Sequence, residues 1–327
     1  MRVLVTGGAG FIGSHLVDRL LADAHDVTCV DNLDDYYAPR LKRHNLLRAL
    51  RSVRFHWVWG DVGDRDLMET LSRGQDVVVH LAARPGVRRS IEEPERYAEV
   101  NVIGTINMLE ASRRAGVDRV VVASSSAVYG VSPDVPFCED TSRLVPASPY
   151  GASKLAAEQF CQVFHRLHGV PVTCLRFFTV YGPRQRPDMA IYQFVTRIAQ
   201  RRPITVFGDG RSQRDYTHVD DVIDGVVQAI AQPRGFQIYN LGTSETASLA
   251  DLIGTIERAL GRRAILDEQP DQPGDAPITV ANIDRAARDL GYRPRIGLEE
   301  GIDRFVAWFR AEQAAPDPAL ALGASPS

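Results

Sequence analysis

Tyr150 and Lys154 are the residues of this sequence whose types and spacing best suit acid–base chemistry. They lie four positions apart in the stretch 148–154, which reads SPYGASK and opens an apolar run with helical periodicity, so both side chains project from one helix face. Free tyrosine titrates near pH ~10, and a neighbouring cation favours its phenolate. The pair predicts a base that exchanges a proton with a substrate hydroxyl, although an amphipathic helix with one aromatic residue shows the same spacing.

A glycine-rich turn near the N-terminus indicates a dinucleotide site. The apolar run 2–6 predicts a strand, and Gly8, Gly10 and Gly13 follow it with the spacing G-x-G-x-x-G before a helical pattern. Glycines in this context permit a tight turn and a close approach of the backbone to a pyrophosphate at a helix N-terminus. A second strand ends at Asp31, whose carboxylate would bind adenosine ribose hydroxyls and repel a 2′-phosphate. The two features predict NAD rather than NADP.

Apolar strands alternate with helical patterns through the first half of the chain. Apolar runs at 54–59, 76–80 and 119–123 predict three further strands. Such alternation is typical of a parallel sheet that is covered by helices on both faces and binds ligands at the carboxyl ends of its strands. We therefore expect an α/β protein with a Rossmann-type doubly wound parallel sheet, followed by a smaller mixed α/β C-terminal lobe.

Several polar or small residues fall at the predicted strand ends. Asp61, followed by Val62, would reach an adenine amino group or merely cap its strand. The small residues of the segment Leu81-Ala82-Ala83 let the backbone pass close to a flat ligand. Asn101, in a helix expected over 97–115, is either a brace for the active site or a structural hydrogen-bonding residue. These positions extend the predicted site across the edge of the sheet.

Composition excludes some classes of partner. The chain has 327 residues, of which 44% are hydrophobic and 24% charged, and a formal charge of -3, which offers no general attraction for nucleic acid or an anionic membrane. No apolar stretch reaches the ~18 residues of a membrane span, and the first residues already predict a strand, so we expect a cytoplasmic protein. Cys29, Cys138, Cys161 and Cys174 lack the spacing of metal ligands. We expect free thiols and no metal site.

Together these motifs resemble the extended short-chain dehydrogenase/reductase family, over residues 1 to about 309. The resemblance rests on Gly7-x-x-Gly10-x-x-Gly13, Asp31, Leu81-Ala82-Ala83, the segment 124–130 (SSSAVYG) and Tyr150-x-x-x-Lys154. It implies that Ser125 positions a sugar hydroxyl, that Tyr150 is the acid/base, and that Lys154 holds the nicotinamide ribose and lowers the tyrosine pKa. The cofactor contacts that the motifs and the resemblance imply are Gly7, Gly10, Phe11, Ile12, Gly13, Asp31, Asn32, Asp61, Val62, Leu81, Ala82, Ala83, Asn101, Tyr150, Lys154 and Phe177.

Small differences choose the reaction within this family. Nucleotide-sugar 4,6-dehydratases carry an Asp-Glu pair directly after the Ser/Thr, where this chain has Ser126 and Ala127, so we set dehydration aside. The segments 175–190 and 272–277 are similar to those of UDP-glucuronate 4-epimerases. That similarity implies that Arg186 binds the sugar carboxylate through two parallel charge-assisted bonds, although Arg184 is equally placed by composition.

The remaining substrate contacts come from the same resemblance. Thr179 stands where galactose-type epimerases carry an Asn, which counts against UDP-galactose as the substrate. Arg214 would contact the diphosphate, while Arg211 is expected to be solvated. The expected substrate-binding residues are Ser126, Thr179, Arg186, Arg214 and Asp275.

The implied function is NAD-dependent 4-epimerisation of a UDP-sugar through a 4-keto intermediate, with UDP-glucuronate and UDP-galacturonate as the preferred pair. A UDP-glucose/UDP-galactose 4-epimerase would use the same residues. A UDP-glucuronate decarboxylase would carry a Glu beside the catalytic Ser/Thr, where this chain has Ser126 and Ala127. A non-catalytic NAD-binding scaffold would have no reason to keep Ser125, Tyr150 and Lys154.

The expected domains follow from the same comparison. Residues 1–180 would form the NAD-binding domain, to which the chain returns at about 218–242, and residues 181–217 and 243–313 would form the nucleotide-sugar lobe. The segment 314–327 is rich in Pro, Ala and Ser without an amphipathic pattern, and we expect disorder there. The resemblance also implies a homodimer, built from the helix over 97–115 and the helix that carries Tyr150.

Overall fold

The computed structural model describes residues 1–270 and 277–314, and a seven-stranded sheet lies at its centre. The strand order is β11-β6-β5-β4-β1-β2-β3, and neighbouring strands run parallel. The strands are β1 (Arg2–Thr6), β2 (Asp26–Asp31), β3 (Phe55–Trp59), β4 (Val77–His80), β5 (Arg119–Ser125), β6 (Val172–Phe177) and β11 (Phe236–Leu241). The order reverses between β1 and β4, which opens a crevice at the carboxyl ends of these strands. The predicted doubly wound parallel sheet is confirmed.

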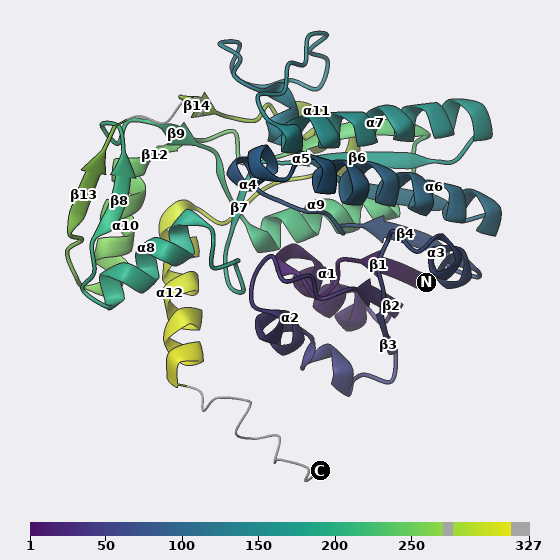
Figure 1. The fold of residues 1–327 in the computed structure, drawn as a ribbon, viewed down its shortest axis with the longest axis horizontal. Coiled ribbons are helices and arrows are strands. Elements are labelled where there is room, and N and C mark those ends of the chain that lie inside the picture. The colour runs from purple at the N-terminus through teal and green to yellow at the C-terminus, as the bar shows by residue number, and fades with distance from the viewer. Residues whose placement is uncertain (271–276, 315–327) are drawn as a thin grey trace.

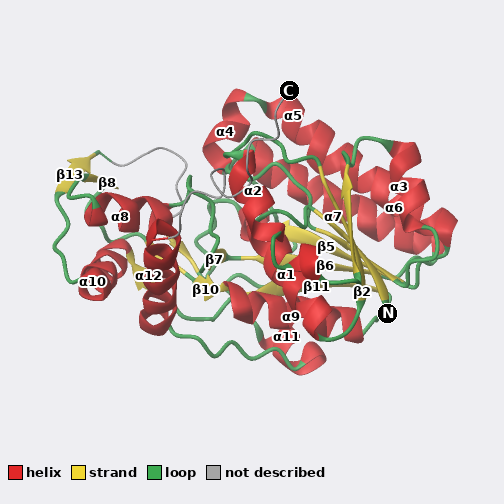
Figure 2. Ribbon diagram, turned by 90° about the horizontal axis from the view of Figure 1, so that it is seen from below, coloured by secondary structure: helices red, strands yellow, loops and turns green. Residues whose placement is uncertain are grey.

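Helices cover both faces of the sheet, as Figure 2 shows. The buried clusters indicate the faces: α1 (Phe11–Ala22), α2 (Pro39–Leu46), α9 (Val219–Ala231) and α11 (Asp284–Leu290) pack on one, and α3 (Arg65–Ser72), α6 (Gly104–Ala115) and α7 (Pro149–His168) on the other. Successive residues of β1 face opposite sides, as a strand requires: Val3 and Val5 belong to the first cluster and Leu4 to the second. Both faces of β1 are therefore buried, and its central residues Val3, Leu4 and Val5 are all apolar.

Helix α7 begins and ends where its sequence supplies caps. The hydroxyl of Ser148 accepts a hydrogen bond from Gly151 N at 3.1 Å, and Pro149 fits the first turn, whose N–H groups have no helical partner. At the other end Gly169 adopts a left-handed conformation with φ 72°. This start places Tyr150 in the first turn, at the edge of the sheet.

The helix predicted over 97–115 is not regular. The structure has α5 (Pro94–Tyr97), a π-helical segment Ala98–Ile103 and then α6. The wider turn contains Asn101, whose side chain bonds to a neighbouring loop instead of facing solvent. Such segments often occur at functional sites, and periodicity in the sequence did not reveal this one.

A second group of elements has its own apolar core. Helices α8 (Ala190–Ala199), α10 (Leu249–Leu260) and α12 (Leu298–Ala314) enclose it. Beside them lie β8 (Ile204–Phe207) and β13 (Leu266–Gln269), which pair in parallel (Figure 1). The short strands that complete the fold are β7 (Thr179–Tyr181) with β10 (Tyr216–His218), and β12 (Ala247–Ser248), β9 (Gln213–Arg214) and β14 (Ile278–Thr279).

Several other expectations concern the C-terminal segment, Asp275, the cysteines and membrane-spanning helices. Ala314, which was expected to begin the disordered segment 314–327, is the last residue of helix α12 and is helical. Residues 315–327 and Asp275 lie outside the described residues. Cys29, Cys161 and Cys174 are buried free thiols, as predicted. Within 1–270 and 277–314, no helix is both long enough and apolar enough to cross a membrane.

Candidate active site

The glycine turn after β1 has no room for side chains. Gly7 has φ +70°, and a Cβ there would lie 2.7 Å from the backbone nitrogen of Ala82, at the end of β4. A Cβ on Gly13 would lie 2.2 Å from Gly7 O. A real Cβ does not come this close to non-bonded atoms, so the turn, α1 and the end of β4 approach each other as only glycine allows. The surface that results is bare backbone at a helix N-terminus, which suits a pyrophosphate.

A cavity runs along the carboxyl edge of the sheet from this turn. It contains Tyr150 and Lys154 together with nearly all the predicted cofactor contacts, and Asn101 is not among the described residues that line it. The predicted residues on its wall are Gly7, Gly10, Phe11, Ile12, Gly13, Asp31, Asn32, Asp61, Val62, Leu81, Ala82, Ala83, Tyr150, Lys154 and Phe177.

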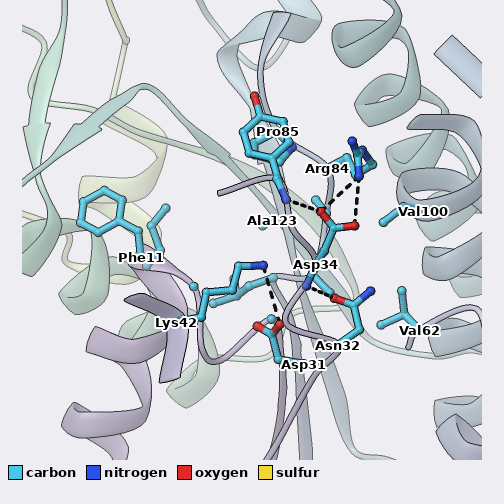
Figure 3. Close-up of a pocket in the computed structure, with 18 of the residues that line it drawn as sticks. Phe11, Asp31, Asn32, Asp34, Lys42, Val62, Arg84, Pro85, Val100 and Ala123 are labelled. Atoms are coloured by element: carbon cyan, nitrogen blue, oxygen red, sulfur yellow. Dashed lines mark hydrogen bonds and ion pairs between the residues drawn. The ribbon is translucent and has the colours of Figure 1, made fainter. Parts of the chain in front are cut away.

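Asp31 lies on the wall of this cavity and is already held by three groups. Its carboxylate accepts hydrogen bonds from Ala9 N at 3.1 Å and Leu33 N at 2.8 Å. Lys42 Nζ lies 4.0 Å away, and Figure 3 shows the two side chains facing each other. Burial raises the pKa of Asp31, and the Lys42 ammonium opposes that rise. Sequence reasoning missed Lys42, because a lysine in a short polar helix has no feature that distinguishes it from a solvated one.

A second group of charged residues lies farther along the cavity wall. Sequence reasoning did not single it out either. Arg84 is 3% exposed, and its guanidinium donates to Asp34 at 3.0 Å, as Figure 3 shows. It also donates to Glu93 at 2.7 Å. Asn101 accepts from Arg84 N at 2.7 Å and donates to Arg84 O and to Ser153 Oγ. The predicted cofactor contact of Asn101 is therefore replaced by a bracing role, in which the π-helical turn holds the loop after β4.

Two of the predicted catalytic residues, Tyr150 and Lys154, line this cavity, and burial dominates the electrostatics of both. Lys154 Nζ donates to Ala123 O at 2.8 Å, and burial lowers the pKa of Lys154 to about 8. Burial raises the pKa of Tyr150, while a hydrogen bond with Ser125 and the positive charge of Arg186 act against that rise. Arg186 is thus a cation that favours the phenolate in this geometry. The lowering of the tyrosine pKa by Lys154 stays a prediction.

His80, the last residue of β4, is buried next to this region as a neutral imidazole ring. It is 2% exposed, and burial, followed by the charge of Lys154, lowers its pKa to about 3. Thr6 Oγ1 accepts a hydrogen bond from Ala82 N, so the hydroxyl of Thr6 can donate its own proton to His80 Nδ1, which lies 2.8 Å from Oγ1. The other ring nitrogen then donates to Thr105 Oγ1 at 3.2 Å. This chain of bonds requires the uncharged imidazole.

A second cavity adjoins the first at Tyr150. Ser124, Phe177 and Arg186 also line both cavities. The predicted residues Ser125, Ser126, Thr179 and Arg214 line the second cavity, as do Met189 and Thr279, which the sequence did not single out. A phenol at the junction of two cavities can exchange a proton with one ligand while it contacts another.

The structure separates the two arginines that composition left equivalent. Arg184 Nη2 donates to Asp18 on α1 at 2.8 Å. Arg186 lines both cavities, lies over the ring of Tyr36 at 5.7 Å from the centroid, and is 19% exposed. Its Nε and Nη2 atoms donate to the carboxylate of Asp188 at 3.0 Å each. The edge that was expected to bind a substrate carboxylate is thus already paired. Nη1 makes no hydrogen bond to a residue of 1–270 or 277–314 and can bind a ligand.

The first cavity fits a dinucleotide of the NAD type. The glycine surface would hold the pyrophosphate, Asp31 with Lys42 would hold the adenosine ribose, and Lys154 would hold the nicotinamide ribose. A 2′-phosphate would meet the carboxylate of Asp31. The observation that supports this fit is the crowding at Gly7 and Gly13, where a Cβ would collide with protein backbone, so only glycine allows the tight turn whose bare backbone lines the cavity.

Comparisons with known proteins agree with this geometry. Residues 3–242 match the family described as the NAD dependent epimerase/dehydratase family. A UDP-glucuronate 4-epimerase of Thermodesulfobacterium geofontis is 39% identical over 93% of this chain and 95% of that protein. The crystal structure of UDP-glucuronic acid 4-epimerase from Bacillus cereus, in complex with UDP-glucuronic acid and NAD, is 37% identical, covers 95% of this chain and 100% of that chain, and has a TM-score of 0.91.

A solved structure with another reaction is equally similar in fold. The dTDP-glucose 4,6-dehydratase DesIV from Streptomyces venezuelae, with NAD and TYD bound, has a TM-score of 0.91 and 35% identity, and covers 97% of this chain and 99% of that chain. Backbone similarity therefore does not choose the reaction, whereas side chains in the second cavity can. The family match covers residues 3–242, and the relative from Thermodesulfobacterium geofontis is identical to this chain at more than a third of the aligned positions. This chain therefore belongs to the NAD dependent epimerase/dehydratase family.

Proposed function

We propose that this protein is an NAD-dependent 4-epimerase of UDP-sugars that interconverts UDP-glucuronate and UDP-galacturonate. The observation that carries the proposal is the position of Arg186, a charged group that lines the same cavity as Tyr150 and whose Nη1 atom can bind a ligand. The relatives named UDP-glucuronate 4-epimerase, at 36–39% identity over nearly the whole chain, support the same substrate. The 4-epimerisation needs an acid/base at one sugar carbon, which Tyr150 supplies.

The proposed mechanism assigns one task to each residue. Tyr150 accepts the proton of the C4 hydroxyl, and Ser125 holds that hydroxyl and stabilises the phenolate. When bound, NAD supplies a reversible acceptor for the hydride at C4. Lys154 holds the nicotinamide ribose. The 4-keto sugar then rotates about its diphosphate, which Arg214 anchors, so that its other face is presented. Tyr150 then returns the proton to the C4 oxygen.

The carboxylate of the substrate creates a hazard that the second cavity must restrain. A 4-keto uronate is a β-keto acid, which loses CO2 when the breaking bond aligns with the ketone. Arg186 Nη1 would hold the carboxylate out of that alignment, and Asp188 would fix the guanidinium. The hydroxyls of Ser126 and Thr179 line the same cavity and would complete the contact.

Proton NMR of the purified protein with UDP-glucuronate, without added reductant, tests the proposal directly. We expect the anomeric signal of UDP-galacturonate to grow to an equilibrium mixture. A UDP-pentose with CO2 would establish a decarboxylase instead, although the residues beside Ser125 lack the Glu that those enzymes carry. Turnover of UDP-glucose and UDP-galactose with none of the uronate would establish the neutral-sugar epimerase and remove the role of Arg186.

Three further assignments accompany this function as proposals. We propose a homodimer through the helix over 97–115 and α7, as the resemblance implies. On α7, Phe160 (38% exposed), Val163 (46%) and Leu167 (69%) recur at helical spacing on a face that the sheet does not cover, which supports the part of α7 in this contact. The division into an NAD-binding domain and a nucleotide-sugar lobe, and a cytoplasmic location, stay predictions from the sequence. Light scattering of wild type and of a Leu167→Lys variant would measure the oligomeric state.

A further inference from the structure

A buried ion pair lies between helix α7 and the central sheet. Glu158 on α7 and Arg176 on β6 are joined by two parallel bonds, from Nε to Oε1 at 2.9 Å and from Nη2 to Oε2 at 2.8 Å, and both side chains are 2% exposed. Removing two charges from water costs about as much as their attraction returns, and apolar residues would hold the helix to the sheet equally well. Stability alone therefore does not account for the pair.

The remaining bonds of the pair reach both ends of one short segment. This serine segment, residues 124–129, carries two of the predicted active-site hydroxyls. At its start Ser124 Oγ donates to Glu158 Oε1 at 2.5 Å. At its end Arg176 Nη1 donates to Tyr129 Oη at 2.9 Å, and the guanidinium lies 4.8 Å from the centroid of the tyrosine ring. One ion pair thus fixes both ends of the segment.

The same pair belongs to the helix that carries the proposed acid/base. Glu158 follows Lys154 by one helical turn and Tyr150 by two, so the three residues lie along one side of α7. The carboxylate also acts on Lys154, because its charge opposes the lowering of the lysine pKa by burial. The helix, the serine segment and β6 are therefore tied together at one buried point.

We propose that Glu158 and Arg176 are positioning residues that hold Ser125 at a fixed distance from Tyr150. Neither is among the described residues that line the two cavities, so they act through their bonds to the ends of the serine segment. The inference rests on the proposed catalytic roles of Ser125 and Tyr150. It does not depend on which UDP-sugar is the substrate.

The test removes a bond of the pair and leaves the pair itself intact. Replacing Glu158 or Arg176 would bury an unpaired charge and risk unfolding the protein. Ser124→Ala removes one bond to the pair, and Ser124→Thr keeps the hydroxyl. Because Ser124 also lines both cavities, the titration of the proposed acid/base without substrate separates the loss of this bond from the loss of a ligand contact. Ser112→Ala is the matched control, because Ser112 is also buried and its hydroxyl donates to Met108 O within α6, away from both cavities.

For Ser124→Ala we expect kcat with the UDP-sugar to fall about 10- to 100-fold while KM stays within about twofold, because small displacements near reacting atoms cost rate and not binding. The pH at which kcat reaches half its plateau should rise, since Ser125 then stabilises the phenolate of Tyr150 less. Ser124→Thr should restore both values, and Ser112→Ala should change neither. Wild-type kcat and pH profile in Ser124→Ala, or equal losses in Ser112→Ala, would overturn the positioning role.

Tyrosinate absorbance gives a measurement that needs no turnover. The difference between the pH titrations of wild type and Tyr150→Phe reports the ionisation of this phenol, and the same difference is then measured in the Ser124→Ala background. An upward shift of the midpoint in that background supports the inference even if no UDP-sugar reacts, a result that would refute the proposed function alone. An unchanged midpoint overturns the inference.

Discussion

Replacing Arg186 by Met should convert a site that prefers a uronate into one that does not. The variant keeps an unbranched apolar stem and loses the guanidinium with its charge. Asp188, the partner that is left, is 36% exposed and can be solvated, so the fold should tolerate the change: a pair of this exposure contributes about 0–1 kcal/mol, and the contact with Tyr36 adds about 0.5–1 kcal/mol. The effect should therefore appear in binding.

The magnitude follows from the atoms that the structure leaves available. Because Asp188 already accepts bonds from Nε and Nη2, we count one charge-assisted hydrogen bond, from Nη1 to the substrate carboxylate. Such a bond contributes about 1.5–3 kcal/mol. At about 1.4 kcal/mol for each factor of ten, the dissociation constant of UDP-glucuronate should rise about 10- to 150-fold. UDP-glucose has no carboxylate and should change less than about twofold by the same reasoning.

Isothermal titration calorimetry in a Tyr150→Phe background measures both constants without turnover. Arg184→Met is the matched control, since Arg184 lies two positions away in the same loop but pairs with Asp18 on α1. We expect the control to leave the ratio of the two constants unchanged. Equal weakening of UDP-glucuronate and UDP-glucose by the Arg186 variant, or an equal change of the ratio in the control, would refute the assignment.

The remaining predictions concern the acid/base, the fold and the cofactor. Tyr150→Phe should lower kcat about 10²- to 10⁴-fold and retain NAD, as measured after denaturation; near-normal turnover would exclude it as the base. The pKa of about 3 for buried His80 lies below its unfolded value, so its stabilising contribution is complete above about pH 6.5 and is lost as pH falls toward 3. Urea unfolding should therefore depend on pH less steeply in His80→Gln, and equal slopes would contradict this. Gly13→Ala places a Cβ 2.2 Å from Gly7 O and should yield protein without NAD.

The sequence by itself determined the elements and the acid/base pair. The strand, glycine turn and helix at residues 2–22 follow from short-range sterics, which act among neighbours in the chain. Helix α7 was predictable for the same reason, because Ser148, Pro149 and Gly169 supply local caps. With the start of α7 known, the spacing of Tyr150 and Lys154 placed both on one face.

The tertiary structure decided which charged groups act together. Arg184 and Arg186 differ by two positions, and their roles diverge because one meets α1 while the other meets Tyr36 and the cavity. Periodicity offered no warning of the π-helical turn that moves Asn101 behind the cavity wall.

Arg176 and Glu158 look like an ordinary strand residue and helix residue until the sheet brings them together beneath the serine segment. The electrostatics of a site depend on neighbours far apart in the chain and on how completely they are buried. Both quantities exist only once the chain has folded.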